Sequence, residues 1–306
     1  GGMDGNLQFS TVQSNRIAGY TPTGRIGIRT GRWTLTASGS GSFTPVAESR
    51  FTETRKQARQ RLPFAGRSDS KSRTNYGRGR FSAVFDPTPK HTAGFDVEYT
   101  ERSTDMPTLS RTTLGQTQSE SRYDKFDRRN NVSATFNYIW KIDTLGSQFK
   151  LIADYTRYTS HGDNSYHTTT CAPGTLRDSL YESATGSVYD ILTADAGLTR
   201  KLPHGLTLRA GLRYTRNDMA DKSRYAAQTQ GTWLALPEYS YDQHYTEQIG
   251  AAYASLEYSA GRWELSAGLR GEYTSVASQT LDRSYFGLFP RVSVSRALND
   301  LRTWLL

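Results

Sequence analysis

The chain has 306 residues, a hydrophobic content of 35% and a mean hydropathy of −0.67. No more than four apolar residues follow one another, so the chain lacks the stretch of roughly 20 that a transmembrane helix requires. Aromatic residues make up 12% of the chain, which argues against intrinsic disorder. A net charge of +9 suits an anionic partner without indicating a fold. The single cysteine, Cys171, excludes an intramolecular disulfide and a four-cysteine zinc site.

Apolar and polar residues alternate with a period of two in many segments, which predicts β-strands with one apolar and one polar face. The clearest case is residues 262–273, where Trp263, Leu265 and Leu269 alternate with Glu264, Arg270 and Glu272. In chain order, we predict strands at residues 25–29, 32–42, 76–85, 93–99, 131–140, 148–155, 186–201, 206–215, 248–258, 262–273 and 286–296, with another beginning near residue 301.

Short and long connections follow one another along the chain. Short turns are predicted at residues 30–31, 86–91, 141–147, 202–205, 260–261 and 298–300, and long polar loops at residues 43–74, 103–126, 159–185, 216–243 and 275–285. This rhythm is typical of a membrane barrel with short turns at one end and long loops at the other. We therefore predict an all-β fold, an antiparallel transmembrane β-barrel, with about 11 to 12 strands in this chain. The alternative from pattern alone is a soluble β-sandwich or propeller.

Four of the five tryptophans lie within a few residues of a predicted short turn. Because tryptophan favours the boundary between hydrocarbon and headgroups, we interpret this set as a periplasmic aromatic girdle. Its members are Trp33, Trp140, Trp263 and Trp304. The alternative interpretation is that tryptophan is simply common at strand ends.

Several short motifs in the chain carry a family resemblance. The segment WELSAGLRGEY at 263–273, preceded by IGAAY at 249–253, is similar to a strand pair of the TonB-dependent-receptor-like outer-membrane barrels of Bacteroidota. LFPRVSVS at 288–295 resembles its following strand, and the hairpins around residues 29–33 and 140–146 resemble its periplasmic turns. Departures are Gly271, where an aromatic residue is usual, and the lack of a TonB box or a complete plug. The resemblance implies that residues 1–16 are the tail of a plug and that residues 17–306 are part of a larger barrel.

By this resemblance the protein would take part in nutrient uptake across the cell outer membrane. Its partners would be outer-membrane lipid and lipopolysaccharide, an unidentified small ligand, and the TonB complex through a plug missing from this chain. Alternatives are a non-transporting adhesin or structural anchor, and a soluble all-β binding protein. No nucleophile elbow, phosphate loop or nucleic-acid recognition module is readable, so we expect no enzyme activity, no cofactor and no nucleic-acid partner.

Two groups of charges are candidate functional residues. The predicted loop at 43–74 is strongly basic and could bind an anionic ligand or lipopolysaccharide phosphates, or could simply be a solvated loop. Its candidate ligand-binding residues are Arg50, Arg55, Lys56, Arg59, Arg61 and Arg67. Charges on the polar face of predicted strands would line the lumen or pair across strands, and they are Arg80, Asp96, Glu98, Asp154, Arg209, Arg213, Glu264, Arg270 and Glu272.

One loop carries potential metal ligands in the order His161, Asp163, His167 and Cys171. Their spacing fits no standard zinc pattern, so we expect no metal site.

Overall fold

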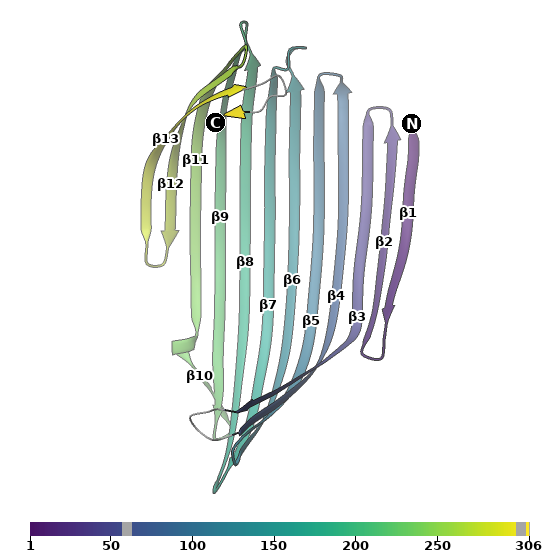
Figure 1. The fold of residues 1–306 in the computed structure, drawn as a ribbon, viewed down its shortest axis with the longest axis vertical. Helices are drawn as coiled ribbons and strands as arrows, with labels where there is room; N and C mark the ends of the chain where they lie inside the picture. Colours follow the sequence, from purple (N-terminus) through teal and green to yellow (C-terminus); the bar gives the residue numbers. More distant parts are fainter. Residues whose placement is uncertain (57–62, 298–303, 306) are drawn as a thin grey trace.

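The computed structural model describes residues 1–56, 63–297 and 304–305. These residues form one antiparallel sheet in which nearly every strand pairs with its neighbours in the sequence (Figure 1). Within the described residues the sheet has 14 strands, in the order β1 to β9 and then β11 to β14, with β10 paired to β9. The ends of this order are not paired with each other, so the sheet is open. The predicted all-β antiparallel fold class is confirmed.

The elements have the following bounds: β1 Gly2–Gln13, β2 Ile17–Thr30, β3 Trp33–Lys56, β4 Pro63–Thr88, β5 His91–Leu114, β6 Thr117–Lys141, β7 Gln148–Ala172, β8 Thr175–Lys201, β9 Leu206–Thr229, β10 Thr232–Ala235, a 3₁₀ turn at Pro237–Tyr239, β11 Tyr241–Ala260, β12 Trp263–Ser278, β13 Asp282–Ala297 and β14 Trp304–Leu305. The predicted strands correspond to β2 through β9 and β11 through β14. No helix in the described part of the chain is long and apolar enough to cross a membrane.

The predicted short turns are confirmed wherever the structure describes them. They lie at the end of the sheet where Figure 1 also places both termini. Gly31 and Gly261 have φ angles of 55° and 58°, a left-handed conformation that glycine adopts without steric cost. These two glycines let the chain reverse within a tight turn. The predicted turn at residues 298–300 lies outside the described residues.

The predicted long loops are wrong, because most of their residues continue the strands. Strands β5 and β6, for example, pair without interruption from His91 and Trp140 to Leu114 and Thr117. These extensions are rich in Ser, Thr, Tyr and charged residues, so the apolar alternation that marks a strand is absent from them. Backbone hydrogen bonds and β-branched threonine hold the ladder in place without apolar side chains.

Residues 1–16 contribute a strand that the sequence assigned to a plug. Strand β1 pairs with β2 from Gly2 opposite Arg29 to Gln13 opposite Ala18, so these residues continue the sheet. Their assignment to the tail of a plug, which the resemblance implies, stays a prediction.

Strand β3 contains a bulge between Thr44 and Ala47, where it gains one residue relative to β4. Because successive side chains of a strand point to opposite faces, this extra residue reverses which side chains of β3 point to which face. Pro45 lies within the bulge, a position where the missing backbone N–H of proline is tolerated.

The sheet is a single layer without a core. Only two apolar residues in the described part are buried, Ala251 and Ala297. Large apolar side chains are instead exposed, among them Leu212 at 64%, Phe286 at 63% and Val292 at 76%. A soluble sheet would cover such side chains with a second layer, so this sheet requires an apolar surrounding.

Candidate functional site

The strand register sorts the side chains onto two faces, since residues directly opposite each other on paired strands share a face. We call the outer face the one that carries Phe95, Phe136 and Leu269, and the inner face the one that carries Asp96, Arg209 and Glu272. An apolar band crosses the outer face on consecutive strands. Its members include Phe81, Phe95, Val97, Ala134, Phe136, Leu151, Ala153, Leu192, Ala194, Ala210, Leu212, Ala254, Leu256, Leu265, Leu269, Val292 and Val294.

The apolar band has the height of a bilayer core. From Trp263 to Tyr273 strand β12 rises about 33 Å at 3.3 Å per residue. A strand tilt of about 40° reduces this to about 25 Å, the usual height of the apolar band on outer-membrane barrels.

Outer-face tyrosines mark the end of the band on alternate strands, at Tyr99, Tyr155, Tyr214 and Tyr273. Tyr99 pairs with Val132 on β6, whereas Tyr155 on β7 pairs with Ala134, two residues closer to the short turns. This stepwise displacement is what strand tilt produces in a barrel wall.

The predicted girdle residues lie at the other end of the band. Trp33, Trp140 and Trp263 are on the outer face, and each is between 41% and 46% exposed. Trp33 stacks on Phe85 with ring centroids 4.4 Å apart. Trp304 lies in β14 opposite Ala297. Their role as a membrane girdle stays a prediction.

The lumen candidates of β9 and β12 are all on the inner face. In the register, Arg209 lies opposite Ser255 of β11. Arg213 and Glu272 lie on either side of Ala251. Arg270 and Glu264 lie on the same face of β12 as Glu272. The guanidinium of Arg209 donates two hydrogen bonds to Glu257 on the neighbouring strand, at 2.8 and 3.1 Å. The predicted pairing across strands is therefore present at Arg209.

Other inner-face charges pair in the same way. Arg80 on β4 lies 2.8 Å from Asp96 on β5, whereas Arg270 and Glu272 pair at 2.7 Å within β12. With the hydroxyl groups between them, these charges make the inner face wettable at the level of the apolar band.

Beyond the tyrosines the outer face changes character. On β4 the outer positions that follow Phe81 toward the tip of the hairpin include Arg73, Lys71, Asp69 and Arg67. The charges that the sequence assigned to loops thus extend the outer wall of the sheet past the apolar band.

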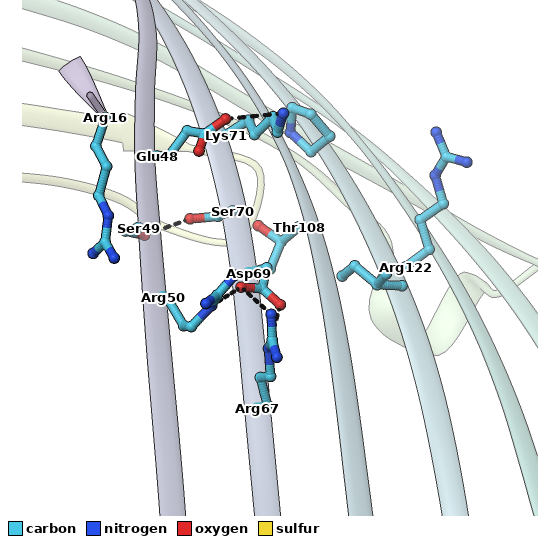
Figure 2. A pocket seen from close by; sticks show the side chains of 12 residues that line it. Arg16, Glu48, Ser49, Arg50, Arg67, Asp69, Ser70, Lys71, Thr108 and Arg122 are labelled. Atoms are coloured by element: carbon cyan, nitrogen blue, oxygen red, sulfur yellow. Dashed lines mark hydrogen bonds and ion pairs between the residues drawn. The ribbon is translucent and has the colours of Figure 1, made fainter. Parts of the chain in front are cut away.

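A candidate binding site is the basic pocket of about 400 Å³ on this extended outer wall (Figure 2). Arg50 on β3 and Arg67 on β4 both bind Asp69, with nitrogen to oxygen distances of 2.5 and 2.7 Å. Hydrogen bonds from Arg67 and Arg50 lower the pKa of the Asp69 carboxyl to about 2. The carboxylate therefore stays charged at neutral pH and orients both guanidinium groups.

Further cations surround this cluster. The pocket is also lined by Arg16, by Arg122, and by Lys71, whose ammonium group lies 2.9 Å from Glu48. Five cations against the two carboxylates of Glu48 and Asp69 leave a net charge of +3 on the lining. Sequence reasoning missed Arg16 and Arg122, because only the pairing of β2, β3, β4, β5 and β6 brings them to the lining of the same pocket as Arg50. For Arg122 the available signal was the alternation of Glu120, Arg122 and Asp124 with uncharged residues, which indicates that the strand continues.

Of the remaining basic-loop candidates, Arg55 does not line the pocket. Arg55 lies on the inner face, where it binds Glu53 and its guanidinium is 5.9 Å from the centroid of the Phe64 ring. Lys56 ends β3 opposite Pro63. Arg59 and Arg61 lie outside the described residues.

The potential metal ligands are spread along one face of β7. His161 binds Asp163 at 2.9 Å, and His167 binds Asp178 on β8 at 2.7 Å. Among the described residues no group of three or more His, Cys, Asp or Glu side chains could hold a metal ion.

Solved structures similar to this chain are outer-membrane barrels of several kinds. The toluene transporter TodX of Pseudomonas putida is 13% identical, with 96% of this chain and 78% of that chain covered and a TM-score of 0.31. The unliganded ferric citrate transporter FecA is 11% identical, with 98% and 56% covered and a TM-score of 0.30. The outer membrane protease OmpT of Escherichia coli is 9% identical, with 84% and 95% covered and a TM-score of 0.25. Likenesses this weak carry no argument about function.

No curated protein matches the sequence. Residues 140–305, more than half of the chain, match the model of the outer membrane protein beta-barrel family. The match extends from β6 to β14 and so includes the inner-face charges of β9 and β12. The sheet, its apolar band and this match agree, and the chain therefore belongs to the outer membrane protein β-barrel family, with the outer membrane as its location.

Proposed function

We propose that this chain is part of the wall of a TonB-dependent-receptor-like barrel that takes up a nutrient across the outer membrane. The observation that carries the proposal is the charged, hydrogen-bonding inner face that crosses the sheet opposite the apolar band. A wall of this kind suits a wide, wet lumen, because barrels of many strands enclose a channel or a plug rather than a packed core. The motifs that resemble the TonB-dependent-receptor-like barrels of Bacteroidota support the receptor type.

In this proposal the barrel transports and does not catalyse. The ligand enters from the end with the long hairpins, and a plug domain that interacts with TonB gates the lumen. The paired inner-face charges, such as Arg209 with Glu257, would hold the plug or line the wet path around it. A non-transporting adhesin or anchor would need no continuous charged inner wall.

Nutrient depletion from the medium tests the proposal. Cells of the native host, cells lacking the gene and cells lacking TonB are grown in the same defined mixture, and the consumed compounds are measured by mass spectrometry. We expect at least one compound that only the first strain removes at the normal rate. Removal that needs the gene but not TonB, or no difference between strains, would contradict the proposal.

We also propose that the basic pocket contacts lipopolysaccharide. Its charged residues are on the outer face, so they are turned away from the lumen and toward the molecules that surround the barrel. From Gly79, opposite Tyr99, to Asp69 strand β4 rises about 33 Å, or about 25 Å above the band after tilt. This height favours the phosphorylated or acidic sugars of the core over the lipid A phosphates. Arginine offers such groups paired, planar donors.

Retention of lipopolysaccharide during purification tests this contact. We expect the double variant Arg50→Gln and Arg67→Gln to lose most of the lipopolysaccharide that the unaltered protein carries through detergent washes. The matched control is Arg129→Gln, which removes an inner-face arginine paired with Asp127 at 2.8 Å. Equal loss from both variants would show that the effect is one of total charge and not of the pocket.

A further inference from the structure

The outer face carries a groove whose floor is made of glycine. Gly39 on β3 lies opposite Gly24 on β2 and Gly79 on β4, and all three share this face. Gly41 and Gly77 lie opposite each other two residues farther along the same strands. Glycine inside a strand commonly marks a place where another molecule approaches the backbone closely. We call this hollow of about 650 Å³ the glycine groove, with these five glycines as its floor.

Apolar side chains form the sides of the glycine groove. A Cβ atom at Gly24 would come within 2.9 Å of Cδ2 of Leu7, so this leucine lies over one side of the floor. A Cβ atom at Gly41 would come within 2.7 Å of Cε2 of Phe43, which covers the end farther from the short turns. Tyr99 on β5 lines the side opposite Leu7. The groove is therefore bounded by apolar groups on three sides.

The middle of the floor is open. A Cβ atom at Gly77 or at Gly79 would meet no other atom within 4 Å. Because β4 pairs with β3 on one side and with β5 on the other, its backbone N–H and C=O groups are engaged in the two ladders. Backbone groups that are already paired can face hydrocarbon without leaving a hydrogen bond unmade. The floor therefore accepts an apolar chain.

The glycine groove lies in the half of the apolar band that is farther from the short turns. Gly79 is opposite Tyr99, the residue that ends the band on β5. On β1 and β2 apolar side chains continue beyond this level, and the outer-face rings of Phe9 and Tyr20 stack with centroids 6.3 Å apart. Since the short turns of outer-membrane barrels face the periplasm, acyl chains of the outer leaflet surround the groove.

The basic pocket lies above the glycine groove on the same face and largely on the same strands. From Gly77 to Asp69 strand β4 rises about 26 Å, or about 20 Å after tilt. The lining of the pocket has a net charge of +3, and the carboxylate beside the groove, Glu101, is bound by Arg128 at 2.6 Å. A molecule with an apolar chain and a negatively charged distal head therefore matches the groove and the pocket in order.

A second hollow on the outer face is similar in size and differs in the charges beside it. It has a volume of about 620 Å³, and Gly250, Gly271 and Tyr214 are among the residues that line it. Two residues beyond Tyr214 on the same face of β9, Arg216 binds Asp218 at 2.7 Å. This pair gives an anionic headgroup no net attraction, so the second hollow is a natural comparison for the glycine groove.

We propose that the glycine groove seats an acyl chain of a lipopolysaccharide molecule whose acidic core sugars reach the basic pocket. The inference extends the proposed contact with lipopolysaccharide and rests on it for the choice of occupant. A phospholipid also has acyl chains, but its small headgroup would end well below the pocket. In apolar surroundings the chain is held by van der Waals packing, which a hollow in the wall provides.

Binding by the purified full-length protein in detergent tests the inference, with native mass spectrometry as the measurement. One probe is complete lipopolysaccharide, and the other is a deep-rough form that keeps the acyl chains but lacks the outer core. We expect both to bind and the complete form to bind more tightly. Equal or tighter binding of a phospholipid with the same chain length would overturn the choice of occupant.

Valine variants locate the seat. Gly77→Val and Gly79→Val fill the open part of the floor with a residue that favours strands. Each should weaken binding of both probes about tenfold, because about ten atom contacts with the chain are lost. The matched control is Gly250→Val in the second hollow, where a Cβ atom also meets no other atom within 4 Å. Only variants that shift mobility on boiling are compared, and unchanged binding by the first two variants, or equal weakening by the control, would refute the location.

The outcomes separate this inference from the proposed contact at the basic pocket. The double variant Arg50→Gln and Arg67→Gln should weaken binding of the complete form and leave the deep-rough form bound. If it changes neither probe while the valine variants weaken both, the contact at the pocket falls and the seat in the groove remains. If it weakens the complete form while the valine variants change neither probe, the groove is overturned and the pocket contact stands. Neither result depends on whether uptake requires TonB.

Discussion

Replacing Leu269 in the middle of the apolar band with arginine tests which face of the sheet meets lipid. Leu269 lies about halfway between Trp263 and Tyr273 on the outer face, is 52% exposed, and pairs with Ala254 and Pro290. On lipid-facing barrel positions near the bilayer midplane, arginine costs about 2–4 kcal/mol. Since about 1.4 kcal/mol corresponds to a factor of ten, Leu269→Arg should lower the folding equilibrium constant about 30- to 1000-fold.

The matched control is Ser266→Arg on the inner face of the same strand. Its position is opposite Glu257 and two residues from Glu264, so the new cation would find carboxylates and water. We expect the free energy of unfolding to change by no more than about 1 kcal/mol.

The assay is urea unfolding of the full-length protein refolded into lipid vesicles, with the mobility shift on boiling as the measure of the folded fraction. A destabilised Leu269→Arg variant beside an unaffected Ser266→Arg variant is the expected result. The reverse order would mean that the two faces have been assigned the wrong way round, and equal stability of both variants would place the sheet outside the bilayer.

Three further predictions concern charge and position. The Asp69 carboxyl should titrate near pH 2 by carbon NMR of labelled protein. Because its folded pKa is below the ordinary value of 3.8, the stabilisation it gives is present above pH 3.8 and is lost as the pH falls toward 2. A midpoint at 3.8 or above would rule out the arginine cluster. In variants that retain one of Trp33, Trp140 or Trp263, lipids brominated near the headgroup should quench the tryptophan fluorescence more strongly than lipids brominated at the chain ends. Equal quenching by both kinds of lipid would contradict the girdle. A double-mutant cycle of Arg209→Leu and Glu257→Leu should give a coupling free energy of about 0.2–1 kcal/mol that decreases with salt concentration. The reason is that the two side chains are partly exposed, at 49% and 37%. A coupling free energy that does not change with salt would indicate a dry lumen.

The part of the sheet that carries the apolar band could be predicted from the sequence, because each strand there has an apolar side that meets the bilayer. The alternation of Leu265 and Leu269 with Glu264 and Arg270 therefore gave both the strand and the faces. The hairpin extensions meet water on both sides, so their strands leave no such pattern. Residues such as Thr168, Thr169 and Thr170 look like a polar loop, although each is paired with a residue on β6 and β8.

The candidate site was only partly predictable for a related reason. Arg50 and Arg67 were identified by the density of basic residues, which is a property of the sequence alone. Their common carboxylate, Asp69, and the neighbours Arg16 and Arg122 follow from register between strands far apart in the chain.

The bulge in β3 has a consequence for how this protein tolerates insertions and deletions. Below Thr44 the even-numbered residues of β3 share the inner face, and beyond Ala47 the odd-numbered ones do. Removing a single residue at Pro45 would therefore turn the whole tip of the strand over, sending Arg50 toward the lumen and Phe51 outward. A gene that gains or loses one codon at this point would exchange the inner and outer faces of the tip of β3 without altering any other residue.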